Sequence, residues 1–150
     1  MWDYIKLIVL GLIVVVGFLV GLTGGLHRYT LGGFTDLACA ISTTCEGLLG
    51  GLVHWRLMRS GRTDALFAPR IAFFTTLYAE ILQMVIILLV ATPFDKSLLL
   101  VRTIATPMIL ANSCGAALFI SMIRDQQRMY EKFSRVFSAK ALTIANRTLG

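Results

Sequence analysis

The sequence predicts an all-α integral membrane protein, a bundle of about four transmembrane helices that continues into a cytoplasmic C-terminal helix. Hydrophobic residues make up 57% of the 150 residues, and the mean hydropathy is +0.78, which is more apolar than an ordinary soluble domain. A helix needs roughly 20 consecutive apolar residues to cross a bilayer. Four runs meet this length, each with one charged residue: 5–26, 37–55, 71–92 and 98–123.

Positive charge is concentrated in two of the segments outside these runs. The formal net charge is +6, but its distribution indicates membrane topology and not nucleic-acid binding. The connections after the first and third runs are close to neutral. Because basic segments stay in the cytoplasm, we expect both termini there. The basic residues are Arg56, Arg59, Arg62 and Arg70 before the third run, and Arg124, Arg128, Lys132, Arg135, Lys140 and Arg147 after the fourth.

Glycines recur at helical spacing in the first two runs. Gly17, Gly21 and Gly25 lie four residues apart, and Gly47 and Gly51 repeat this spacing in the second run. Small residues in such rows let a second helix approach the backbone closely. We therefore expect both rows to serve helix packing.

A glycine-rich polar break, residues 27–36, separates the first two helices. The two glycines at 32–33 permit a tight turn. Thr35 or Asp36 is a suitable N-cap for the second helix. We expect this helix to begin with unpaired backbone N–H groups close to Arg28.

The third and fourth helices carry polar residues that are costly in hydrocarbon. Glu80 and Gln83 share one helix face and should point into the bundle. The fourth helix is expected to be interrupted at Pro107, which removes one backbone hydrogen bond. Asn112 and Ser113 follow it and are placed to satisfy freed backbone groups.

From Arg124 onward the chain is polar but keeps a helical pattern. Met129, Phe133, Val136 and Phe137 form an apolar stripe, which is too short to identify a coiled coil. We expect residues 1–123 to form a transmembrane receptor domain and residues 124–150 a cytoplasmic signalling helix. Both ends of the chain suggest a piece of a longer protein.

Arg28 is the first candidate for ligand binding, because a guanidinium presents a planar fork of donors that suits a carboxylate. Cys39 and Ser42 lie on one helix face nearby and would add a thiol and a hydroxyl. Together they suit a small anion with a second oxygen atom. Two alternatives remain open: Arg28 extends to the outer headgroups, and Ser42 bonds back to its own helix.

Glu46 and Glu80 are intramembrane carboxylates, a residue class that is often functional. For both we expect instead a structural pairing, with Arg102 or His54; a place near the headgroups remains open as an alternative. For His27 and His54, polar contacts at helix ends are the better interpretation, because the two are far apart in the sequence.

The sequence contains no catalytic or metal-binding pattern. Cys39, Cys45 and Cys114 lie in apolar runs without a C-x-x-C pair, and no nucleophile with its base is evident. We predict no cofactor and no metal, and a binding role in place of catalysis.

Several separated motifs resemble the membrane domain of the LytS/YehU family of bacterial sensor histidine kinases. The similarity extends over roughly residues 15–142. The motifs are G-L-T-G-G-L-H-R-Y-T-L-G-G-F-T-D-L-A-C-A-I-S-T, E-G-L-L-G-G-L-V-H, S-G-R-T-D, A-E-I-L-Q-M-V-I-I-L, N-S-C-G-A-A-L-F and Y-E-K-F-S-R-V-F-S-A-K-A-L.

The resemblance implies a receptor in the bacterial inner membrane for a small carboxylate such as pyruvate. Arg28, Cys39 and Ser42 match the family's ligand-contacting positions. In the family, a GAF-like domain and a histidine kinase follow the receptor, and the partner is a LytTR-type response regulator. The expected partners are therefore the ligand, the lipid bilayer, a second copy of the chain and, for full-length relatives, that regulator. From the sequence pattern, and not from the resemblance, the residues expected to support the site with polar groups are His27, Asp36, Glu46, Glu80, Gln83 and Asn112.

Three departures from the family pattern stand out. The family has further upstream helices with another ligand-contacting arginine, which this chain does not supply. Asp36 replaces a small neutral residue, and a carboxylate there could pair with Arg28 and weaken anion binding. The kinase is absent, so we expect no enzymatic activity from this chain.

We therefore expect a four-helix sensor fragment that binds a monocarboxylate from the outer side and passes the change into the C-terminal helix. Two other classes remain open. A small-solute carrier subunit would use the same Arg28 site with access from both sides. A helix-association module would use only the glycine rows.

Overall fold

The computed structural model describes residues 2–148, with the side chains of residues 10–137, Tyr4 and Ile8. Met1, Leu149 and Gly150, at the ends of the two predicted domains, lie outside the described residues. So do the side chains of Lys140 and Arg147. The elements in order are α1 (Trp2–Thr30), α2 (Asp36–Arg59), the 3-10 helix η1 (Thr63–Phe67), α3 (Pro69–Val90) and α4 (Phe94–Thr148).

The predicted all-α membrane fold is confirmed. Every described element is a helix, and α1 to α4 each contain a stretch long and apolar enough to cross a membrane. The helix boundaries fall where polar residues separate the apolar runs.

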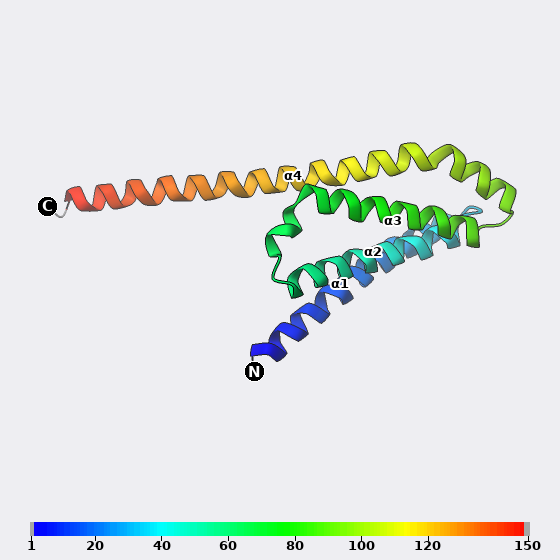
Figure 1. The fold of residues 1–150 in the computed structure, drawn as a ribbon, viewed down its shortest axis with the longest axis horizontal. Helices are drawn as coiled ribbons and strands as arrows, with labels where there is room; N and C mark the ends of the chain where they lie inside the picture. The colour runs from blue at the N-terminus through cyan, green and yellow to red at the C-terminus, as the bar shows by residue number, and fades with distance from the viewer. Residues whose placement is uncertain (1, 149–150) are drawn as a thin grey trace.

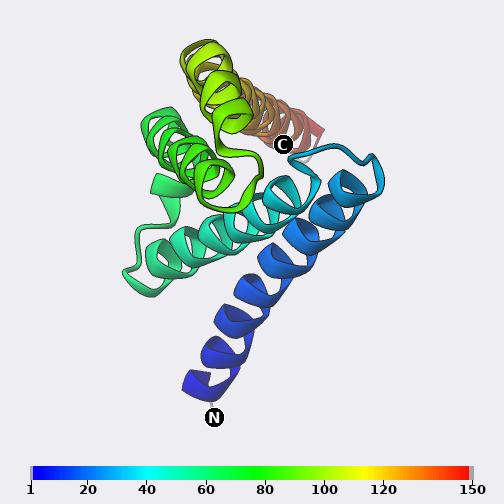
Figure 2. The ribbon, with the colours of Figure 1, turned by 90° about the vertical axis from the view of Figure 1, so that its right-hand side faces the viewer.

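The helices form an open stack in chain order, not a closed bundle. α1 packs on α2, α2 on α3, and α3 on α4, while no described residue of α1 has a Cα near those of α3 or α4. Figure 2 shows α1 leaning away from the α3–α4 pair. One face of α1 is therefore free, and its exposed apolar side chains include Leu12, Val16 and Leu19. In a bilayer this face meets lipid or another helix, because lipid tails satisfy apolar side chains as well as protein does.

The two ends of the stack carry different connections. The link between α2 and α3, which contains η1, lies at one end, and the α1–α2 and α3–α4 links lie together at the other (Figure 1). α4 extends well beyond the other helices in the direction of the α2–α3 link (Figure 1). We call the end that holds the α1–α2 and α3–α4 links the loop end.

Glycine determines how closely α1 and α2 approach. A Cβ atom added at Gly21 would lie 2.8 Å from the Thr43 carbonyl oxygen, and one added at Gly25 would lie 2.5 Å from that of Ala40. A Cβ at Gly47 would lie 2.5 Å from the Gly17 carbonyl oxygen. These neighbours are backbone atoms, which cannot rotate away. The two helices can therefore pack backbone to backbone only where both sides lack a side chain.

The same contact continues at the far end of the glycine row. A Cβ at Gly51 would lie 3.2 Å from the Val14 Cα, and one at Gly17 would lie 2.9 Å from the Gly51 Cα. The structure thus places all five glycines of the two rows at the α1–α2 contact.

The polar break forms a turn that depends on glycine. Gly32 and Gly33 have φ values of +73° and +122°, which other residues adopt only at a cost. The turn ends at Thr35, which is the N-cap residue of α2 but makes no side-chain capping bond.

The expectation of an unpaired α2 N-terminus is wrong for two of its N–H groups, those of Asp36 and Leu37. The Asp36 N–H donates to the Gly33 carbonyl, whereas the Cys39 N–H makes the first bond of the helix itself, to the Thr35 carbonyl at 2.8 Å. The Leu37 N–H donates to Asp36 Oδ1 at 2.5 Å. The Asp36 carboxylate and the preceding turn therefore occupy donors that an anion would have needed.

The predicted interruption at Pro107 is also wrong. α4 continues through Pro107 as one helix of 55 residues, and it curves over its first part before running straight (Figure 1). A proline removes a single backbone bond and its ring disturbs one turn, so a long helix bends there without ending. At about 1.5 Å per residue, α4 spans about 80 Å, well beyond the roughly 30 Å hydrocarbon core.

Candidate ligand-binding site

A cavity of about 210 Å³ opens at the loop end of the stack. All four long helices and the α1–α2 turn contribute to its wall. The volume is below the roughly 300–1,000 Å³ that is usual for drug-sized ligands, so the cavity suits a ligand of a few heavy atoms. Its lining residues are Arg28, Leu31, Gly32, Thr35, Asp36, Cys39, Gln83, Ile87, Leu100, Ile104 and Met108.

Arg28 brings the positive charge to this cavity. It lies in the last turn of α1, where a cation is favoured by the carboxyl end of the helix. Arg28 is exposed as a whole, and it lines the cavity. Arg28 thus lines the same cavity as residues of α3 and α4, although the α1 backbone does not approach those helices.

Asp36 brings a carboxylate to the same cavity. Its Oδ1 accepts the Leu37 N–H, so part of its charge is directed toward the α2 backbone and away from Arg28. The cavity wall nevertheless carries one positive and one negative residue. An anionic ligand would therefore compete with Asp36 for Arg28.

Cys39 and Ser42, although predicted together, lie in different surroundings. Cys39 is half-buried and lines the cavity. Ser42 is fully buried, does not line the cavity, and donates from its hydroxyl to the Cys39 carbonyl at 3.1 Å. Ser42 thus makes the hydrogen bond within its own helix that the sequence left open as an alternative.

Gln83 is the polar residue that α3 places in the cavity wall. Only 4% of its surface is exposed, and its neighbour in the wall is the fully buried Ile87. The sequence predicted that Glu80 and Gln83 face the interior, and both are buried. Their roles differ, because Gln83 lines the cavity and Glu80 does not.

Glu80 holds α3 to α4. The Asn112 side-chain amide donates to Glu80 Oε1 at 2.6 Å, while Glu80 Oε2 is buried without a hydrogen-bond partner. The expected partner of Glu80 was Arg102 or His54, and that expectation is wrong. Asn112 was expected to satisfy backbone groups freed by Pro107, but its amide reaches the neighbouring helix.

Glu46 lies on α2 and is half-buried. Its Oε1 is buried and has no hydrogen-bond partner. The stack therefore encloses two carboxyl oxygens without partners, on facing helices. Such groups need compensation from a proton, a water molecule or an opposite charge.

His27 and His54 lie apart from each other. His27 is exposed next to Arg28, while His54 lines an apolar groove of about 530 Å³ between α1 and α2. Within the described part of the chain, no group of three or more His, Cys, Asp or Glu residues is arranged to hold a metal ion.

The sequence did not identify the apolar side of the cavity. Leu100, Ile104 and Met108 recur every fourth residue on α4 and so share one face. That spacing is visible in the sequence. It gives no signal there, because apolar residues such as Leu99, Val101 and Ile109 also occupy other faces of this part of α4.

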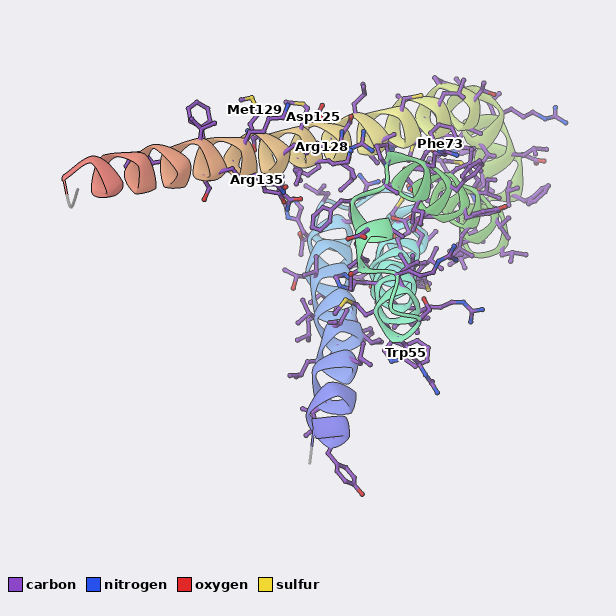
Figure 3. The ribbon with its side chains drawn as sticks, turned by 60° about the vertical axis from the view of Figure 1, so that its left-hand side comes forward. Trp55, Phe73, Asp125, Arg128, Met129 and Arg135 are labelled. Carbon is purple, nitrogen blue, oxygen red and sulfur yellow. The ribbon has the colours of Figure 1, made fainter. Side chains whose placement is uncertain are left out.

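The opposite end of the molecule carries aromatic and basic side chains. The Arg59 guanidinium lies 5.1 Å from the centre of the Trp55 ring, at the end of α2. Figure 3 shows Trp55 there, and Arg128, Met129 and Arg135 along the extended part of α4. Arg59, Arg128 and Arg135 therefore lie far from the cavity.

Comparison with known proteins identifies a family. The family described as 5TMR of 5TMR-LYT matches residues 4–126. The sensor histidine kinase BtsS of Escherichia coli (strain K12) is 54% identical over 136 residues, which is 91% of this chain and 24% of that protein. The sensor protein LytS of Bacillus subtilis (strain 168) is 41% identical over 134 residues, 89% of this chain and 22% of that protein.

A further relative, LytS of Staphylococcus haemolyticus, is 32% identical over 134 residues, 89% of this chain and 22% of that protein. The chain thus spans about a quarter of the length of these relatives. No solved structure gives a significant match. The resemblance seen in the sequence motifs is confirmed. The chain belongs to the 5TMR-LYT family, and it is a membrane sensor domain of histidine kinases of the BtsS and LytS type.

Proposed function

We propose that this chain is the receptor part of a sensor histidine kinase and that it binds a small carboxylate such as pyruvate in the cavity at the loop end. The observation that carries the proposal is the cavity itself. It combines one arginine with a carboxylate, a thiol, an amide and an apolar wall. A guanidinium suits a carboxylate, and the apolar wall suits a short carbon chain.

The proposed orientation places the loop end outside the cell. The α2–α3 link and the adjoining ends of α2 and α3 carry four arginines, Arg56, Arg59, Arg62 and Arg70, and they lie at the end opposite the cavity (Figure 1). By the positive-inside rule this end is cytoplasmic. Residues 1–123 would then form the receptor in the bacterial inner membrane. Residues 124–150 would extend into the cytoplasm, with both termini inside.

The proposed relay runs through α4. Leu100, Ile104 and Met108 touch the cavity, and the same unbroken helix continues to Thr148. A ligand that binds one packing of α4 more tightly than another would shift the population of the two packings. The shift would reach the cytoplasmic end because the helix has no break between the two places.

The proposed partners are a second copy of the chain and a LytTR-type response regulator. Met122, Met129 and Val136 recur every seven residues on α4, Phe133 falls between the last two, and all four are exposed. An apolar stripe of this spacing suits a parallel helix pair. The response regulator would act on full-length sensors, since this chain matches only their membrane part.

The test is pyruvate binding to the purified chain in nanodiscs, measured by calorimetry for the wild type, Arg28→Ala and Arg102→Ala. Arg102 is a matched control, because it is an exposed arginine in the first part of α4 that does not line the cavity. We expect saturable binding that Arg28→Ala abolishes and Arg102→Ala leaves within about twofold. Absence of binding to the wild type, or equal loss in both variants, would overturn the proposal.

A further inference from the structure

Gln83 is a buried amide for which the described residues provide no partner. Its side chain is 96% enclosed and lines the cavity. The side-chain hydrogen bond between α3 and α4 comes from Glu80, one turn earlier, and none of the described residues hydrogen-bonds the Gln83 amide. A buried amide without a partner is unfavourable. Among the described residues, the fully enclosed side-chain atoms without a partner do not include those of Gln83, so its amide is open to the cavity and takes its partner, water or ligand, from there.

The amide lies on a different helix from the other polar groups of the cavity. Arg28 comes from α1 and Cys39 from α2, whereas Gln83 comes from α3. Arg28 accounts for a carboxylate, but it does not account for a second oxygen on the ligand. Ser42 does not line the cavity, and a thiol is only a weak donor. The Thr35 hydroxyl also lines the cavity, from the α1–α2 turn that follows Arg28, and Gln83 is the hydrogen-bonding residue that α3 adds. The Gln83 amide offers both a strong donor and an acceptor.

We propose that Gln83 is the specificity-determining residue of this cavity. Its amide N–H donates to the oxygen at C2 of a short 2-oxo acid whose carboxylate is held by Arg28. The methyl end of the acid then lies against the apolar wall of Ile104 and Met108. The inference rests on the proposed function and adds to it the class of acid that is selected.

Selection for a 2-oxo acid is expected because an acid without the C2 oxygen would leave the Gln83 amide without a hydrogen-bond partner. Propionate has the carbon skeleton and the carboxylate of pyruvate but carries a methylene group at C2. With propionate bound, the Gln83 amide would stay buried without a partner. Sites that bind a polar group in this way reject analogues lacking it more strongly than apolar pockets reject small changes of shape.

The experiment compares the affinities of pyruvate and propionate for the wild type, Gln83→Met and Gln127→Met in nanodiscs. Methionine keeps the length and flexibility of glutamine without its amide. Gln127 is an exposed glutamine on α4 outside the cavity and is the matched control. We expect the wild type to prefer pyruvate at least tenfold, as one well-made buried hydrogen bond allows. Gln83→Met should weaken pyruvate about tenfold and leave propionate within about twofold.

Each outcome decides between the two proposals. If both acids bind through Arg28 and their affinity ratio is the same in the wild type and in Gln83→Met, the role of Gln83 is overturned and the proposed function stands. Equal weakening of both acids would indicate a structural role and would also overturn the inference. If neither acid binds the wild type, both proposals fail. Because the ratio is measured on one preparation, a smaller folded fraction of the variant does not change it.

Discussion

Replacing Gly47 with alanine should separate α1 from α2. The added Cβ would lie 2.5 Å from the Gly17 carbonyl oxygen and 2.6 Å from the Gly21 Cα, and ordinary contact begins at 3.4 Å. The helices must therefore move apart locally by 3.4 − 2.5 = 0.9 Å. A gap of roughly 0.5–1 Å forfeits a quarter to a half of each neighbouring dispersion contact, and overpacking of this kind costs about 1–3 kcal/mol.

Gly50 provides the matched control on the same helix. A Cβ there would meet no atom within 4 Å, so Gly50→Ala adds the same methyl group without a clash. Alanine also favours a helix over glycine by up to about 1 kcal/mol. We expect Gly50→Ala to be as stable as the wild type or slightly more stable, while Gly47→Ala loses stability.

The measurement is reversible unfolding by SDS in mixed micelles, followed through helical circular dichroism. Gly47→Ala should unfold at a lower SDS fraction than the wild type, and Gly21→Leu at a lower fraction still. If Gly47→Ala and Gly50→Ala unfold at the same SDS fraction, the glycine rows do not set the distance between α1 and α2, and the reasoning is refuted.

Three further predictions concern the turn, the cavity and the α3–α4 contact. Asp36→Asn keeps a side-chain oxygen that can accept the Leu37 N–H but removes a negative charge from the cavity, and this charge is worth on the order of 1 kcal/mol of binding free energy. Pyruvate should therefore bind about fivefold more tightly, as measured by calorimetry. Weaker binding would argue against competition between Asp36 and the ligand for Arg28. Gly33→Ala forces a side chain into φ +122° and should cost roughly 1–3 kcal/mol in SDS unfolding, whereas Gly115→Ala, which meets no atom within 4 Å, should cost nothing. Asn112→Ala removes the amide that donates to the buried Glu80, and it should lower the free energy of unfolding by about 0.6–2 kcal/mol. A double variant that also carries Glu80→Leu should be less destabilised than the sum of the two single variants. Strict additivity would show that the two residues do not interact.

The four helices were predictable because each membrane-spanning helix is one continuous apolar run in the sequence. Each apolar run is bounded by charged or glycine-rich residues. An apolar run of this length crosses a bilayer as a helix, because a helix satisfies its backbone hydrogen bonds within the segment. The turn at Gly32 and Gly33 was predictable for a similar local reason. Two adjacent glycines between helices supply positive φ at no steric cost, and the structure has positive φ at both.

The arrangement of the helices was not predictable from the same signal. Lipid and protein are equally apolar, so the sequence does not distinguish the face of α1 that meets α2 from the face that meets the bilayer. The open stack and the identity of Leu100, Ile104 and Met108 as cavity residues therefore appear only in three dimensions.

The partners of the buried polar groups were also hidden. Glu80 and Asn112 are 32 positions apart, and no local pattern links them. Arg102 looked like the better partner because charge is readable from sequence and distance is not. Ser42 and Cys39 share a helix face in the sequence, yet only one lines the cavity, because neighbouring helices cover the other.

The unbroken α4 has a mechanical consequence for a sensor. About 30 residues separate Pro107 from Phe137, which at about 1.5 Å per residue is a lever arm of roughly 45 Å. A tilt of about 5° about a point at Pro107 would swing the far end by roughly 4 Å on that length. A small change at the cavity wall would then arrive at the basic end as a displacement of about three quarters of a helical turn.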